Sequence, residues 1–185
     1  MSKRTNLIKD YSGIFGYQVV LKNRKGKSVM YFPHVRSKTP PTPGQMAVKM
    51  RLKLASAYAK NALQNPALAV MYKAKATKSI SPYRLAVNDY LRRPYIHKID
   101  SSGFQGNPGD KITVVAGDDF KLDSVSVKIL DPDGQTVEEG ICTFNLAAAY
   151  YEYSATKKLP AIPGSAIIAS ARDIPGNITQ LTITL

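Results

Sequence analysis

The chain has 185 residues, of which 44% are hydrophobic, enough for one domain with a core or for one domain and an appendage. It contains no run of the roughly 18 apolar residues that a membrane-spanning helix needs, and the opening MSKRTNLIKD lacks the apolar stretch of a signal peptide. Cys142 is the only cysteine, which excludes an internal disulfide and favours a cytoplasmic or assembly-associated (virion) location.

The net charge of +13 is divided unevenly along the chain. Residues 1–100 contain 20 Lys and Arg against three Asp, which gives +17. Residues 101–185 contain 6 basic and 10 acidic residues, which gives −4. This asymmetry predicts two regions with different partners, and the natural partner of the first region is a polyanion.

Residues 1 to about 15 are expected to form an exposed, basic arm. After it, Tyr17, Val19 and Leu21 recur at every second position, which is the periodicity of a β-strand. Residues 28–32 form a second β-type run, and the turn between the two contains Gly26, which suits a positive φ. These features predict a β-hairpin with a cationic tip.

A proline-rich strap follows, with four prolines among residues 33–43, and it is expected to be extended. It ends at a helix start, because Thr42 can cap, Pro43 suits the first helical position and Gln45 completes a capping box. The helix is predicted to reach about Gln64. Its apolar stripe comprises Val48, Leu52, Ala55, Ala59 and Ala62, and a basic stripe beside it comprises Lys49, Lys53, Ser56 and Lys60.

Two further helices are predicted from a similar start signal. Asn65-Pro66 opens a helix that reaches about residue 76, and Ser81-Pro82 opens another that ends before Pro94. In both cases a capping side chain stands before a proline, whose missing N–H would have had no partner inside the helix anyway.

From residue 95 onward the pattern changes to short β-type runs separated by turn sequences such as 106–109 and 131–134. About seven strands with turns every 8–12 residues are typical of a β-sandwich. The runs are 95–99, 111–115, 125–129, 136–144, 148–155, 166–169 and 178–185. The expected fold class is therefore α+β, with a basic arm, hairpin and helical region over residues 1–94 and an immunoglobulin-like β-sandwich over residues 95–185.

The segment GYQVVLKNRKGKSVMYFP, followed by PPTPGQMAVKMRLKLA, is similar to an uncharacterised family common in Bacteroidetes, in which a basic hairpin precedes a Pro-Thr-x-x-Gln helix. The segments GDDFKLDSVSVKILDPDGQ and ASARDIPGN resemble bacterial immunoglobulin-like modules. The first resemblance covers about residues 14–60, and the second covers about residues 95–185. Neither implies a catalytic residue, and the chain has no Trp, so the second resemblance lacks the Cys…Trp…Cys core of antibody domains.

The segment KNRKGKS ends like a phosphate-binding P-loop, in Gly26-Lys27-Ser28. A P-loop needs a second glycine five positions earlier and a helix afterwards. Leu21 stands at the first of these places, and a β-type run follows Ser28. The sequence therefore argues against a nucleotide site here. A solvated turn and a non-specific phosphate contact both stay open.

Other candidate sites have simpler interpretations. Gly117-Asp118-Asp119 and the Asp131–Gly134 stretch are interpreted as turns, because neither a polymerase pattern nor the remaining calcium ligands accompany them. His34 and His97 belong to no Cys/His cluster, and Cys142 is interpreted as a small core residue. No catalytic set, metal or cofactor is expected.

The basic half carries the one functional hypothesis, because Lys and Arg bind phosphate backbones without reading base sequence. The candidate nucleic-acid contacts are Arg24, Lys25, Lys27, Arg36, Lys38, Lys49, Lys53, Lys60, Arg92 and Arg93. We expect a non-enzymatic structural or assembly protein that contacts a polyanion, with the sandwich contacting other copies or another protein. A generic basic surface stays open, as do an acidic protein partner and a subunit of a virion, filament or secretion-type assembly without a nucleic-acid role.

Overall fold

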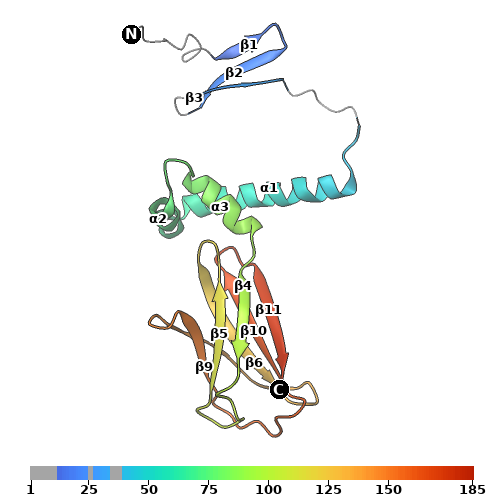
Figure 1. Ribbon diagram of the computed structural model, residues 1–185, viewed down its shortest axis with the longest axis vertical. Coiled ribbons are helices and arrows are strands. Elements are labelled where there is room, and N and C mark those ends of the chain that lie inside the picture. The colour runs from blue at the N-terminus through green and yellow to red at the C-terminus, as the bar shows by residue number, and fades with distance from the viewer. Residues whose placement is uncertain (1–11, 25–26, 34–38) are drawn as a thin grey trace, which may run out of the picture. The chain divides into compact units, whose positions relative to one another are not determined.

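The computed structural model describes residues 12–24, 27–33 and 39–185. The chain divides into two compact units, Met1–Pro43 and Gly44–Leu185. Figure 1 follows the elements in chain order, from a small β-sheet through three helices to a larger group of strands. The described part holds three helices and eleven strands in three sheets, so the predicted α+β class is confirmed at that level.

The first unit contains an antiparallel sheet of three strands in the order β1-β2-β3. The predicted hairpin is confirmed in β2 (Val19–Arg24) and β3 (Lys27–Tyr31), while its tip at 25–26 lies outside the described residues. β1 (Gly13–Phe15) corrects the expectation that the arm extends to about residue 15. The rest of that arm, 1–11, and residues 34–38 of the strap also lie outside the described part.

A tight turn produces β1. Gly16 and Tyr17 both have positive φ, of 54° and 58°, and the Gln18 amide donates to the Phe15 carbonyl at 3.0 Å. Two consecutive residues of positive φ are the conformation of the two-residue hairpin turn that matches strand twist. Tyrosine seldom adopts this conformation, so the turn could not be foreseen from residue types.

The three helices begin at the predicted prolines: α1 (Pro43–Gln64), α2 (Pro66–Lys75) and α3 (Pro82–Leu91). Asn65 caps α2 by accepting from the amides of Ala67 and Leu68. Ser81 caps α3 by accepting from the amide of Arg84. Side-chain acceptors at these positions satisfy amides that have no partner within the helix, which is why both helices start where the sequence predicted.

Two four-stranded antiparallel sheets follow, in the orders β4-β5-β9-β8 and β11-β10-β6-β7. Their strands are β4 (Tyr95–Asp100), β5 (Lys111–Gly117), β6 (Leu122–Leu130), β7 (Thr136–Ile141), β8 (Thr143–Asn145), β9 (Tyr150–Ser154), β10 (Ala166–Asp173) and β11 (Ile178–Thr184). The run predicted as one strand over 136–144 is in fact two strands. The chain passes from one sheet to the other at Cys142, whose amide donates to the Val125 carbonyl at 2.8 Å.

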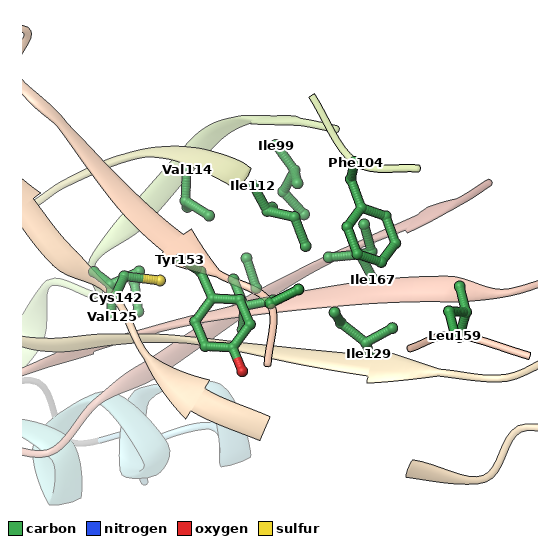
Figure 2. Close-up of a cluster of buried hydrophobic side chains, with 14 residues drawn as sticks. Ile99, Phe104, Ile112, Val114, Val125, Ile129, Cys142, Tyr153, Leu159 and Ile167 are labelled. Carbon is green, nitrogen blue, oxygen red and sulfur yellow. The ribbon is translucent and has the colours of Figure 1, made fainter. Parts of the chain in front are cut away.

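The two sheets enclose one hydrophobic core. Alternate residues of β10 (Ile167, Ala169 and Ala171) are fully buried, as expected for a strand with one face in a core. Figure 2 shows Ile129, Ile167 and Tyr153 in this cluster, with the first two side chains from one sheet and Tyr153 from the other. The predicted core position of Cys142 is confirmed, and burial raises the pKa of its thiol to about 12, so the thiol is protonated at neutral pH.

The helices lie at one end of the two sheets (Figure 1) and share a second, smaller core with them. Phe120, in the turn between β5 and β6, stacks on the ring of Tyr72 from α2 with centroids 4.4 Å apart. Helices and sheets therefore belong to one compact unit, and the boundary predicted at residues 94 and 95 stays a prediction. None of the described helices is long and apolar enough to cross a membrane.

Candidate polyanion-binding surface

One face of α1 carries a row of lysines. Lys49, Lys53 and Lys60 are spaced at four and seven residues, so they project from the same side of the helix. All three are exposed, and within the described residues none of them forms an ion pair. α1 contains no acidic residue, so no negative charge of the same helix interrupts the row. We call these three residues the lysine row.

The other side of α1 is only partly packed. Ala55, Ala59 and Ala62 are buried, which confirms the second half of the predicted apolar stripe. Its first half is corrected, because Val48 is 65% exposed and Leu52 is 50% exposed. The first turns of α1 thus present cationic and apolar side chains together.

Arg51 was not singled out from the sequence, and it has a structural role. Its guanidinium donates to the Leu91 carbonyl at 3.1 Å. Leu91 is the last residue of α3, where helix carbonyls lack partners and a cation is favourable. Arg51 therefore joins α1 to the end of α3, and we do not count it among the residues available to a polyanion.

Arg92 and Arg93 follow α3 directly, and both are exposed. Arg92 pairs with Asp119, and this hydrogen bond and charge raise the pKa of the guanidinium. The predicted turn at Gly117-Asp118-Asp119 is confirmed, since the Asp118 carboxylate accepts from the amides at positions 120 and 121. Asp119 thereby offsets the charge of Arg92, and Arg93 is the more available cation of the two.

The remaining predicted contacts belong to the first unit. Lys27 is exposed on β3, and Arg24 is the last residue of β2. Lys25, Arg36 and Lys38 lie outside the described residues. Of the ten predicted contacts, the structure therefore places Lys49, Lys53 and Lys60 in one row on α1, and it places Arg92 and Arg93 separately, directly after α3.

A groove of about 590 Å³ lies between the helices and the β5–β6 turn. Its lining comprises Lys75, Ile80, Arg84, Leu85, Asn88, Asp89, Arg92, Asp119 and Phe120. The Lys75 ammonium is held against Phe120, because it donates to the Phe120 carbonyl and lies 4.6 Å from the centroid of the Phe120 ring. Sequence reasoning did not identify this groove, since its walls come from segments far apart in the chain.

Asp89 is the buried carboxyl of this groove. It accepts from the Tyr72 hydroxyl at 2.5 Å, and the Tyr58 and Tyr72 hydroxyls lie 2.9 Å apart. Its other oxygen, Oδ1, has no hydrogen-bond partner among the described residues. Burial raises the pKa of Asp89 to about 7, and the negative charges of Asp118 and Asp173 add to the effect. The carboxyl is therefore partly protonated near neutral pH.

Asn177 connects the sandwich to the helices. Its side-chain amide donates to the Tyr90 and Arg92 carbonyls, each at 3.2 Å, and to the Asp173 carboxylate at 2.7 Å. Asp173 is fully buried, and burial raises the pKa of its carboxyl. These bonds give the Asn177 amide a structural role at the junction.

In the described part of the chain, no group of three or more His, Cys, Asp and Glu side chains could hold a metal ion.

No family model matches the sequence, and no curated protein matches it. Among solved structures, the chain is similar to CopC from Methylosinus trichosporium OB3b, with 15% identity and a TM-score of 0.35 over 49% of this chain and 88% of that one. It is also similar to a β-1,3-glucan-binding domain of carbohydrate-binding module family 56, with 19% identity and a TM-score of 0.33 over 50% of this chain and 99% of that one. At TM-scores this low, neither similarity carries an argument about fold or function.

Proposed function

We propose that the chain is a non-enzymatic assembly protein whose basic N-terminal half contacts a polyanion, with nucleic acid bound without base readout as the leading candidate. The observation that supports this best is the lysine row, because three exposed ammonium groups on one helix face have no ion pair within the described residues. Lysine contacts phosphate as a point charge and selects no base.

The geometry of the row suits a backbone contact. At 1.5 Å of rise per residue, the row from Lys49 to Lys60 extends over roughly 16 Å. B-form duplex carries one charge per ~1.7 Å of its axis, so such a row can face several phosphates. Arg93 adds a further exposed cation at the end of α3. Each contact would release condensed counterions and weaken as salt rises.

The second half is proposed to be an immunoglobulin-like sandwich that contacts protein, in line with the resemblance to bacterial immunoglobulin-like modules. Its net charge of −4 opposes the +17 of the first half. Opposite charges of this kind favour head-to-tail contact between copies and accelerate encounter. The proposed resemblance to the Bacteroidetes family implies no enzymatic activity for this chain.

The experiment is a titration of the full chain against random duplex DNA, random single-stranded RNA and heparin across a salt series. We expect the chain to bind all three, with the logarithm of the association constant (log K) falling steeply as the logarithm of the salt concentration (log salt) rises. Equal affinity for unrelated DNA sequences is expected as well. Failure to bind any of the three polyanions at low salt would reject the proposal.

A second candidate function is a subunit of a virion, filament or secretion-type assembly with no nucleic-acid role. Of the 19 large hydrophobic residues that are exposed in the described part, 12 lie between Ile14 and Leu54. Phosphate contact does not require such apolar exposure, whereas large exposed apolar patches mark sites of protein contact. Concentration-dependent oligomers in light scattering, together with no polyanion binding at low salt, would favour this candidate over the first.

A further inference from the structure

The strand register of the N-terminal sheet separates its residues into two faces. Leu21 lies opposite both Gly13 of β1 and Met30 of β3, and Val19 lies opposite Phe15. Residues that lie opposite one another in an antiparallel pair share a face, and neighbours along a strand alternate. One face therefore comprises Gly13, Phe15, Val19, Leu21, Asn23, Ser28 and Met30.

This face contains no charged residue, and we call it the uncharged face. The opposite one, which we call the charged face, comprises Ile14, Val20, Lys22, Lys27, Val29 and Tyr31. The division is unexpected in a half-chain of +17. The register places the lysines of β2 and β3 on one side and leaves the other side without charge, while large apolar residues occur on both.

Among the described residues of the first unit, the uncharged face is exposed. Phe15 is 56% exposed and Met30 is 69% exposed, while Val19 and Leu21 are half-buried. A sheet needs three or more strands with a hydrophobic face, or packing against a helix, to be stable by itself. No residue of β1 or β3 is buried, so this sheet has no core of its own within the described residues.

We propose that the uncharged face is a self-association surface, on which the same face of a second copy packs. Two identical faces without charge meet with no like-charge repulsion, and a two-fold contact places the same patch on both copies. An acidic partner would need cations on this face for recognition, and the cations lie on the other one. The pair would form a two-layered sheet sandwich with both charged faces outward, each free to contact a polyanion.

The size of the face predicts how strong this contact is. Seven residues per copy are fewer than the roughly 20–30 per side of a standard interface. The pair is therefore expected to be weak and to depend on protein concentration. Sedimentation of the full chain from low micromolar to several hundred micromolar should show a monomer–dimer equilibrium.

Matched double substitutions identify the face. The variant Phe15→Glu with Met30→Glu places two charges on the uncharged face, one on β1 and one on β3. The variant Ile14→Glu with Val29→Glu places two charges on the same strands but on the charged face. The first is expected to weaken dimerisation at least about tenfold, and the second to change it less than about twofold. A monomeric wild type at all concentrations, or equal losses in both variants, would overturn the proposal.

A cross-linking measurement avoids introducing charge, in case glutamates unfold the sheet. Met30→Cys and Val29→Cys place thiols on adjacent residues of β3 and on opposite faces. The native Cys142 is buried and its raised pKa keeps it unreactive, so the wild type provides the background. A bismaleimide is expected to produce covalent dimers from Met30→Cys and several-fold fewer from Val29→Cys. Equal yields would reject the face assignment.

Self-association through the uncharged face does not depend on polyanion binding. If the chain binds DNA with a steep salt slope but stays monomeric, the self-association surface is rejected and the proposed function stands. If the uncharged face mediates dimers but no polyanion binds, the proposed function is rejected and the surface stands.

Discussion

The Tyr72 hydroxyl donates to the Asp89 carboxylate at 2.5 Å, in a site where Asp89 is 3% exposed. The two residues come from α2 and α3 and lie 17 positions apart. Ionised carboxylates are costly to bury, and one hydrogen bond with one oxygen left unpartnered offsets only part of that cost. The packing of the helices is therefore coupled to the protonation of Asp89.

The first prediction concerns pH and the substitution Asp89→Asn. The folded-state pKa of about 7 lies above the ordinary value of 3.8, so the folded chain binds more protons than the unfolded chain between these values. The free energy of unfolding should therefore fall as pH rises through this window, at up to about 1.4 kcal/mol per pH unit. Asp89→Asn removes this contribution, and it should be more stable than wild type above pH ~7.

Urea unfolding followed by circular dichroism at about pH 5 and pH 8 measures this difference. The control is Asp133→Asn, a substitution in the exposed turn between β6 and β7. It should leave the pH dependence as in wild type. An Asp89→Asn variant that kept the wild-type pH slope would show that another group, such as the buried Asp173, causes it.

The second prediction compares two adjacent glutamates of β7. Glu138 is buried, and one of its oxygens accepts from the Tyr153 hydroxyl, the amide and hydroxyl of Thr156, and the Lys157 amide. Glu138→Ala leaves these donors without a partner and should cost roughly 2–4 kcal/mol of unfolding free energy. Glu139 pairs with Lys128 near the surface, so Glu139→Ala should cost less than about 1 kcal/mol. Equal losses in urea unfolding would contradict the anchoring role of Glu138.

Much of the fold could be predicted from the sequence because its signals are local. The caps at Asn65 and Ser81 act on amides two or three residues away, so the helix starts were correct. The β-type runs were found as strands for the same reason, except the run over 136–144, which is divided into β7 and β8. The change of sheet at Cys142 could not be predicted, because the Val125 carbonyl that fixes it is distant in the chain.

The candidate site was predictable only where it depends on helical spacing. The lysine row follows from the intervals between Lys49, Lys53 and Lys60. Which apolar residues are covered depends on long-range packing, so the exposure of Val48 and Leu52 could not be foreseen. The partnership of Arg92 with Asp119 likewise joins residues 27 positions apart.

The third prediction tests the lysine row with a pair of matched charge changes. Lys49→Gln with Lys53→Gln removes two positive charges from α1, and Lys121→Gln with Lys158→Gln removes two exposed charges from the sandwich. If the row contacts duplex phosphates, the first variant should reduce the slope of log K against log salt by about 1.8. The control should keep the wild-type slope. Equal reductions in titrations with random duplex DNA would mean that only net charge matters.

The fourth prediction concerns two exposed apolar residues of α1, Met50 and Leu54, which we call the exposed side of α1. Met50 and Leu54 lie one turn apart and are 54% and 44% exposed. Because both are exposed and glutamine is a good helix former, Met50→Gln with Leu54→Gln should change the unfolding free energy by less than about 1 kcal/mol. A larger loss would show that the two side chains pack against the chain itself.

The same variant should change self-association in a salt-dependent way. At low salt, the lysine row on two copies of α1 repels, and at high salt this repulsion is screened while apolar attraction persists. Light scattering of the wild type should therefore rise with salt, opposite in sign to polyanion binding, and Met50→Gln with Leu54→Gln should suppress that rise. Val70→Gln, at an exposed position of α2, should leave it unchanged. If scattering rises with salt equally in all three proteins, the exposed side of α1 is not the contact, and the second candidate function loses this part of its support.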